Sequence, residues 1–291
     1  LCRALSVCPD VMIDDGGDIR RGLRWEAGEL IVPRGRDGAA RACLRTYLTP
    51  SDFIDDRYSP SFSPLLYPGQ TARFALRANG AARAYADMVD LNGARRLYGE
   101  TVRADAGGVA EITVPPTADA VILRVGVETD ADNARLQRVS FTGSPCYCLR
   151  AGALREENWS PCHSEISQFS AAEGSWRLEN GRVVASSASD ALLLTGGTDW
   201  ADGEISVRAY PRGGAEAGVA FLCGGVIRGY AALARADGRV RLVRLDDRRR
   251  AIAEATIPPV GENGVALRAR VENGLIRIDA DGVPAFTARN D

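Results

Sequence analysis

The chain has 291 residues, a hydrophobic fraction of 45% and a formal net charge of −2, so its length predicts about two globular domains. The small negative charge disfavours partners held by charge alone, so no nucleic-acid or membrane partner is expected, and no apolar run approaches the roughly 20 residues of a membrane-spanning helix. All 36 basic residues are arginine, and His163 is the single histidine. This composition excludes a lysine Schiff base, a lysine general base and any mechanism that needs two histidines.

Residues 1–20 form a predicted N-terminal extension. Its opening, "LCRALSVCPDVMIDD", holds one positive residue, Arg3, and no long apolar block, so it is a poor signal peptide. We therefore expect a cytoplasmic protein, and the first residue, Leu1, indicates processing or a piece of a longer chain. The seven cysteines fit a cytoplasmic location, because an odd number in a chain of this length is more typical of reduced thiols than of a disulfide framework.

Residues 21–145 are predicted to form a β-sandwich of the jelly-roll type. Apolar and polar residues alternate in "TARFALR" (71–77) and, less strictly, in "AVILRVGVE" (120–128), as strands with one wet face require. Gly-containing turn dipeptides separate such runs. Their spacing predicts about eight or nine strands between Trp25 and Thr142, which pack as two sheets.

The run "ARLQRVSF" (134–141) closes this predicted domain with an uneven spacing. Leu136 and Val139 stand three positions apart, whereas strict alternation would place inward residues two or four apart. One extra residue in the strand would let both side chains point to the inner face, so the spacing predicts a β-bulge.

Residues 146–172 are predicted to be an ordered linker. They show no hydrophobic period, and they contain Cys146, Cys148, Cys162 and His163. These side chains are of the types that bind zinc, but C-x-C followed by an adjacent Cys-His pair is not a usual zinc spacing, since neighbouring side chains seldom point at one metal. We expect free thiols here; the alternatives are a Cys–Cys bridge and a structural zinc site.

Residues 173–291 are predicted to form a second antiparallel β-sandwich of about eleven strands. Asn-Gly or Asp-Gly pairs separate its alternating runs, and such pairs favour two-residue hairpins because both residues tolerate positive φ. The pairs stand at 180–181, 202–203, 237–238, 263–264, 273–274 and 281–282. The run "DDRRR" (246–250) predicts a charged hairpin tip.

The order of segments in this second domain resembles a concanavalin A-like sandwich of the LamG or laminarinase type. The segments are "TDWADGEISVRAY", "GGAEAGVAF", "RGYAALAR", "GRVRLVRL" and "LIRIDADGVPAF". In "GEISVRAY" (203–210), Ile205, Val207 and Ala209 fall on one face of the predicted strand.

A narrower resemblance covers about residues 60–290. The second-domain segments, preceded by "SPLLYPGQTARFALRA" and "ARLQRVSFTGSP", resemble the C-terminal accessory region of bacterial ADP-ribosylglycohydrolase-family proteins. This resemblance implies a jelly roll followed by a concanavalin A-like sandwich, both accompanying a catalytic domain. The catalytic core of that family is all-helical and holds a pair of magnesium ions. No comparable helical pattern exists in this sequence, so none of the family's catalytic residues carry over.

The acidic residues do not form an expected hydrolase site. Laminarinase-type enzymes carry E-x-D-x-x-E on one strand, which places the acid and the nucleophile on one face, and this sequence lacks that motif. The pairs Asp14-Asp15, Asp55-Asp56 and Asp246-Asp247 are neighbours in the chain, and neighbours on a strand point to opposite faces. We expect them in solvated turns, with Ca²⁺ binding as the alternative. No cofactor is expected, and structural calcium or zinc is the alternative.

Sugar binding requires exposed aromatic faces and planar polar groups in a groove. The candidate ligand-binding residues are Trp200, Tyr210, Arg228 and Tyr230, and each has a core position as its alternative. The leading prediction is a non-catalytic accessory or glycan-binding module, with a carbohydrate ligand and either a separate catalytic domain or a second copy of the chain as partner. The alternatives are a glycoside hydrolase, or a β-sandwich subunit of one, and a structural or oligomerisation module.

Overall fold

The computed structural model describes most of the chain and is almost entirely β. The described residues are 11–15, 18–21, 24–32, 40–44, 67–90, 96–116, 121–131, 133–146, 148, 150, 152, 154, 156–160, 163–166, 169–185, 190–195, 200–225 and 228–290. Within them no helix is long and apolar enough to cross a membrane. The chain divides into two compact units, Leu1–Thr195 and Gly196–Asp291. This division falls later in the chain than the predicted boundary at 172–173.

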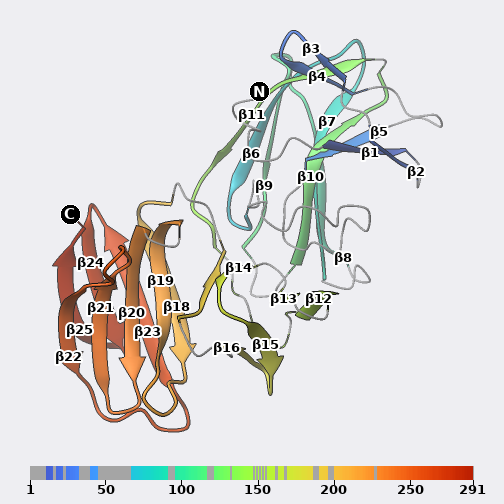
Figure 1. Ribbon diagram of the computed structural model, residues 1–291. Helices are drawn as coiled ribbons and strands as arrows, with labels where there is room; N and C mark the ends of the chain where they lie inside the picture. Colours follow the sequence, from blue (N-terminus) through green and yellow to red (C-terminus); the bar gives the residue numbers. More distant parts are fainter. Residues whose placement is uncertain are drawn as a thin grey trace. The chain divides into compact units, whose positions relative to one another are not determined.

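The N-terminal unit contains two large antiparallel sheets (Figure 1). The six-stranded sheet has the order β2-β1-β5-β10-β7-β8. Its strands are β1 (Val11–Asp15), β2 (Asp18–Arg21), β5 (Ala40–Leu44), β7 (Ala82–Asp90), β8 (Arg96–Arg103) and β10 (Val121–Thr129). The five-stranded sheet has the order β3-β4-β11-β6-β9. Its strands are β3 (Arg24–Glu26), β4 (Glu29–Val32), β6 (Thr71–Arg77), β9 (Val109–Thr113) and β11 (Ala134–Thr142).

The strand pairing in these sheets is that of a jelly roll. β4 pairs with β11, β5 with β10, β6 with β9, and β7 with β8, all antiparallel. Successive pairs alternate between the two sheets, as they do when one long hairpin is rolled into a double-sheet sandwich. The jelly-roll prediction is therefore confirmed, and the described residues between Arg24 and Thr142 hold nine strands, β3 to β11.

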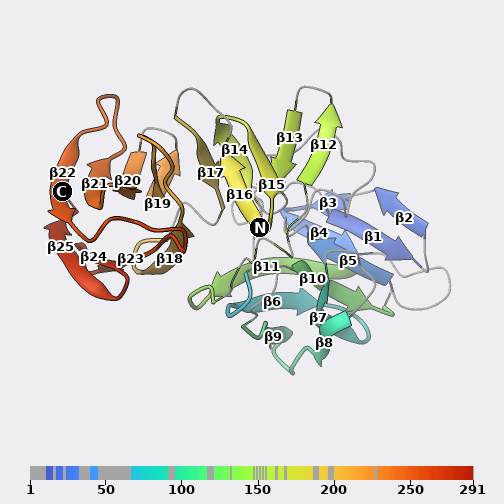
Figure 2. The same ribbon diagram turned by 90° about the horizontal axis from the view of Figure 1, so that it is seen from below.

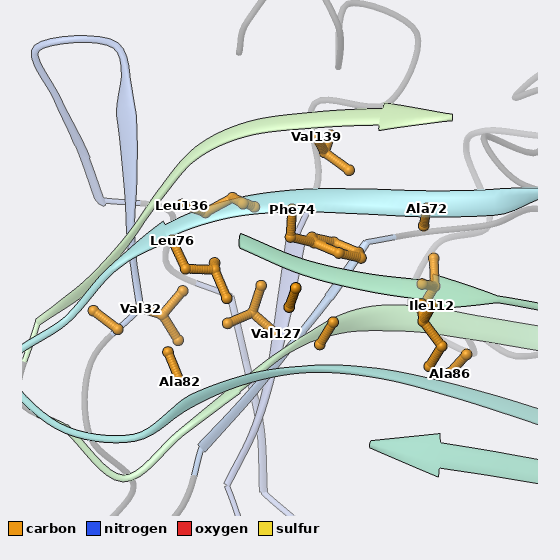
Figure 3. Packing of buried hydrophobic residues seen from close by; sticks show 14 of the residues in the cluster. Val32, Ala72, Phe74, Leu76, Ala82, Ala86, Ile112, Val127, Leu136 and Val139 are labelled. Atoms are coloured by element: carbon orange, nitrogen blue, oxygen red, sulfur yellow. The ribbon is translucent and has the colours of Figure 1, made fainter. Parts of the chain in front are cut away.

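The inward faces of the two sheets form the core of this unit (Figure 3). Ala72 and Phe74 of β6 have no exposed surface, and Leu76 is 5% exposed. Val125 and Val127 of β10 are also buried, whereas the side chains of Val121 and Leu123 lie outside the described part. Full burial of a side chain the size of Phe contributes about 1.5–3 kcal/mol, so alternation along β6 stabilises the sandwich directly.

The predicted bulge in β11 is confirmed. The register between β11 and β6 shifts between Leu136 and Arg138, so that Gln137 is the extra residue. Leu136 and Val139 are both buried as a result. The shift keeps both side chains on the inner face despite their odd spacing.

Among the described residues of the N-terminal unit, six further strands form three two-stranded sheets. β12 pairs with β13, β14 with β17, and β15 with β16. Their bounds are Glu156–Ser160, His163–Ile166, Ser170–Glu173, Trp176–Glu179, Arg182–Ala185 and Leu192–Leu194 for β12 to β17 in order. The predicted linker thus contains strands. The eleven strands β15 to β25 match the number predicted for the second domain, but β15, β16 and β17 cluster with the first unit.

The C-terminal unit is an antiparallel sandwich of two four-stranded sheets. One sheet has the order β18-β23-β24-β25 and the other β19-β20-β21-β22, and Figure 2 shows them as two facing rows. The bounds are Gly203–Ala209 (β18), Glu216–Gly225 (β19), Arg228–Arg235 (β20), Arg239–Arg244 (β21), Ala251–Thr256 (β22), Val265–Glu272 (β23), Leu275–Ala280 (β24) and Val283–Arg289 (β25). The sandwich prediction is confirmed, and the finer concanavalin A-like type stays a prediction.

Three of the six predicted turns in this half of the chain are two-residue hairpins. Asn180-Gly181, Asn273-Gly274 and Asp281-Gly282 have positive φ at both residues and join strands paired directly across the turn. The other three differ. Gly203 opens β18, Gly238 ends a three-residue connection, and Gly264 precedes β23. An Asn-Gly or Asp-Gly pair therefore permits positive φ, but it does not by itself predict that the flanking strands form a two-residue hairpin.

Candidate functional site

Two of the candidate ligand-binding residues lie at opposite ends of β18. Trp200 precedes the first residue of the strand, and Tyr210 follows its last residue. A strand of seven residues spans about 20 Å. Trp200 and Tyr210 are therefore too far apart to contact one small sugar together.

Hydrogen bonds gather several loops at the end where Trp200 lies. In the β23–β24 turn, Asn273 N donates to Asp202 Oδ1 over 3.1 Å. Asn290 N, directly after β25, donates to Gly274 O over 2.8 Å. These two bonds hold the start of β18, the β23–β24 turn and the end of β25 at one end of the sandwich.

The second sheet is tied to the same end by Tyr230. Its hydroxyl donates to Asn290 Oδ1 over 2.7 Å, which links β20 of one sheet to the end of β25 in the other. Arg228 is the first residue of β20 and stands two positions before Tyr230, so it lies at the same end of the sandwich. We call this region the Asp202 end; its members are Trp200, Asp202, Arg228, the Asn273–Gly274 turn and Asn290.

Tyr230 is a core residue and not part of a groove. The side chain is 5% exposed, and its ring stacks on Phe221 with a centroid distance of 6.0 Å and an interplanar angle of 21°. A ring covered to this extent offers no face to a sugar, which corrects its prediction as a ligand-binding residue. Its position follows from the strand period, since Ala232 and Ala234 on the same face are also buried.

Arg228 presents its charged group to solvent. The residue is exposed, and its stem lies against the backbone of β19: a Cβ added at Gly224 would stand 3.0 Å from Arg228 Cδ. An aliphatic stem laid on a strand end with the guanidinium in water is a common arrangement for arginine. Among the described residues no side chain holds this guanidinium, so its donors can bind a carboxylate or phosphate.

The β21–β22 hairpin tip lies next to Arg228. Leu245 N donates to Gly229 O over 2.9 Å, which brings residues 246–250 to the Asp202 end. Asp246 pairs with Arg250 at 2.8 Å, and the hydrogen bond from this guanidinium lowers the pKa of the Asp246 carboxyl. The predicted charged hairpin tip is confirmed.

Trp200 and Tyr210 are both half-buried, and each already contacts other groups of the chain. At the opposite end of the sandwich, the Tyr210 ring lies on the turn before β23, where a Cβ added at Gly264 would stand 2.7 Å from Tyr210 Cδ1. Arg208 Nη1 donates to Asn263 O of the same turn over 3.2 Å. Tyr210 therefore supports a turn, while Trp200 lies at the Asp202 end with Arg228.

Several carboxylates on the C-terminal sandwich are held by arginines. Glu204 accepts hydrogen bonds from Arg268 and from Arg270, the latter at 2.9 Å, and these bonds lower the pKa of Glu204. Glu216 accepts from Arg241 Nε over 2.8 Å. A carboxyl whose pKa is lowered carries no proton to donate at neutral pH, so Glu204 and Asp246 are unsuited to the general acid of a glycosidase.

The proposed metal ligands of the linker are described only in part. Cys146 and Cys148 are free and exposed, whereas Cys162 and the side chain of His163 lie outside the described residues. Cys223 on β19 is also free, and burial raises the pKa of its thiol to about 11. Among the residues that the structure describes, no group of three metal-binding side chains comes together; the zinc and calcium alternatives stay predictions.

The tyrosines of the N-terminal unit that are described belong to its packing. Tyr67 and Tyr85 are 2% and 3% exposed. Tyr98 packs partly against the core and donates to Glu100, and burial raises its pKa. These rings leave the Asp202 end as the better candidate for a ligand.

Sequence reasoning missed Asn290, which accepts the Tyr230 hydroxyl. The two residues are 60 positions apart, and no local pattern marks an Asn beside the C-terminal end of a strand. Only the packing of the two sheets, with β25 in one and β20 in the other, brings it to Tyr230.

Comparison with known proteins adds little to this geometry. No protein-family model matches the chain, and no curated protein matches it. A solved structure described as accessory secretory protein 1, 2 and 3 in Streptococcus pneumoniae shares 14% identity at a TM-score of 0.25, covering 42% of this chain and 90% of that chain. A likeness this low carries no argument about function.

Proposed function

We propose that the chain is a non-catalytic accessory module that binds a glycan at the Asp202 end of its C-terminal sandwich. The observation that carries the proposal is the gathering of Trp200 and the exposed Arg228 at this end, through the bonds of Asp202, Asn273 and Asn290. Loops at the end of a rigid sandwich are the usual place for binding residues, because the sheets hold them in position.

The side chains favour an acidic sugar or a nucleotide sugar. An indole supplies an apolar ring for stacking, and a guanidinium binds carboxylate or phosphate through paired hydrogen bonds. The resemblance to the accessory region of ADP-ribosylglycohydrolase-type proteins supports a ligand of this class and a catalytic domain as partner. A cytoplasmic location belongs to the same proposal and is supported by the free thiols of Cys146, Cys148 and Cys223.

A binding screen against glycans and nucleotide sugars tests the proposal, with calorimetry on each hit. Trp200→Ala and Arg228→Ala are expected to weaken binding by about tenfold or more, the loss of one stacking or charge-assisted contact. Tyr210→Ala is the matched control, because Tyr210 lies at the opposite end of the same sandwich. No binding to any member of the screen, or an equal loss with Tyr210→Ala, would contradict the proposal.

A further inference from the structure

Strand β18 is far more exposed than its sequence pattern predicts. Six of its seven residues are exposed, including Ile205 at 40% and Val207 at 36%. β23, its neighbour in the sheet, is buried at alternate positions. The exposure is therefore confined to the edge of the sheet.

Ile205 and Val207 lie on the inner face of their sheet. In the antiparallel register, Ile205 is opposite Ala269 and Val207 is opposite Leu267. Residues directly opposite each other point to the same face, and Ala269 and Leu267 are core residues, 1% and 0% exposed. The inner face thus continues onto β18 with core-type side chains that the described unit covers only in part.

The edge of β18 also lacks the protection that the other edges have. Of the four edge strands described in this sandwich, β19, β22 and β25 each show a register shift with their neighbour, and β25 also contains Pro284. β18 pairs with β23 over seven consecutive residues without a shift and without proline. Bulges and proline are two of the devices that keep an edge strand from pairing with another chain, and β18 has neither, so its edge can accept an added strand of complementary charge.

The sequence of β18 is complementary to itself when read antiparallel. With Ser206 opposite Ser206 of a second copy, Glu204 lies opposite Arg208, and Ile205 lies opposite Val207. Opposite charges and apolar pairs at facing positions both stabilise antiparallel strands. Glu204, Ser206 and Arg208 occupy the outer face and Ile205 and Val207 the inner face in both copies.

Other registers lose this match. A slip of one residue places inner-face residues opposite outer-face ones. A slip of two residues in one direction sets Arg208 opposite Ser206 and Glu204 opposite Tyr210; in the other direction it sets Glu204 opposite Ser206, while Arg208 faces Asp202, just outside the strand. The centred register is thus the one that sets Glu204, which Arg268 and Arg270 already hold within its own sheet, opposite Arg208 of the second copy.

We propose that β18 is the dimerisation edge of this protein, and that its occupant is β18 of a second copy. The two four-stranded sheets would join into one eight-stranded antiparallel sheet around a two-fold axis at Ser206. The pairing satisfies the free backbone groups of the edge and covers Ile205 and Val207 with the same residues of the partner. This inference goes beyond the proposed function and does not depend on it, since it rests on the exposure and the register of β18.

Charge exchange tests the register with the full chain. Multi-angle light scattering over a range of protein concentrations is expected to show a dimer for the wild type. Arg208→Glu sets Glu opposite Glu204 of the partner, and Glu204→Arg sets Arg opposite Arg208. Each variant is expected to weaken the dimer by about tenfold or more. A one-to-one mixture of the two variants restores both opposite-charge pairs, so dimers should return as heterodimers.

A cysteine placed on the axis gives a second, independent measurement. The Cα atoms of facing residues stand about 4.5–5.5 Å apart, within the range that a disulfide bridges. Ser206→Cys treated with oxidised glutathione should therefore give a 206–206 linked peptide by mass spectrometry. Thr287→Cys, on the edge strand β25 at the other side of the sheet, is the matched control and should give none. A monomeric wild type, a dimer unaffected by Arg208→Glu, or no 206–206 peptide would each overturn the proposal.

Discussion

Strands β6 and β18 have the same alternating sequence pattern, but β6 lies inside its sheet and β18 lies at the edge of its sheet. Both alternate apolar and polar residues over seven positions. β6 lies between β11 and β9 in its sheet, and Phe74 and Leu76 are buried there. β18 ends its sheet, and Ile205 and Val207 are exposed. Alternation therefore tells which face a side chain is on, but not whether a second layer covers that face.

The largest expected effect comes from truncating an apolar side chain in each strand. Phe74→Ala removes a fully buried ring and should lower the free energy of unfolding by about 3–5 kcal/mol. Val207→Ala, in dilute protein, should cost less than about 1 kcal/mol, because 36% of the residue is already in water. Urea unfolding followed by circular dichroism measures both. Equal losses would mean that β18 is covered as well as β6 is.

A smaller effect is expected at Tyr230, which joins the two sheets of the C-terminal unit. Tyr230→Phe keeps the stacking on Phe221 and removes the bond to Asn290 Oδ1, so stability should fall by about 1 kcal/mol. A double-mutant cycle with Asn290→Ala isolates the bond: the two losses should not add. Fully additive losses would show that the bond contributes nothing.

The smallest effect is expected from acid. Hydrogen bonds from Arg268 and Arg270 lower the pKa of Glu204 in the folded state below its ordinary value of 4.5. Below 4.5 the unfolded chain therefore binds more protons, so stability is full above this pH and falls as pH drops toward the folded pKa. The urea midpoint should stay level from neutral pH to about 5 and then decline. Glu204→Gln should decline less, and an identical decline would contradict the role of Glu204.

Much of the fold was predictable because its signals are local. The spacing of Leu136 and Val139 indicated a bulge, and a register shift is present there. Asn273-Gly274 and Asp281-Gly282 form hairpins because each residue takes positive φ. Asp202-Gly203 has the same composition but opens a strand, and its Asp202 side chain accepts a bond from Asn273, a residue distant in sequence. A dipeptide cannot encode that partner.

The candidate site was predictable only in part. Trp200 and Arg228 lie at one end of the sandwich, but Tyr210 lies at the other. Tyr230 stands only two positions after the exposed Arg228. It is nevertheless buried, since its ring stacks on Phe221. No sequence pattern distinguishes a tyrosine at the mouth of a groove from one that stacks in a core. In both cases the tyrosine stands at a strand position whose side chain points to the inner face of the sheet.

By itself, the sequence determines that the chain is all β, that its strands alternate and where several of them turn, because these properties depend on neighbouring residues. Only the tertiary structure decides which strands of the jelly roll pair with which, that Tyr230 is core and that the apolar face of β18 stays partly exposed. Burial is a property of two surfaces, and the covering surface comes from strands that are far away in the chain or, for β18, from a second molecule as we propose.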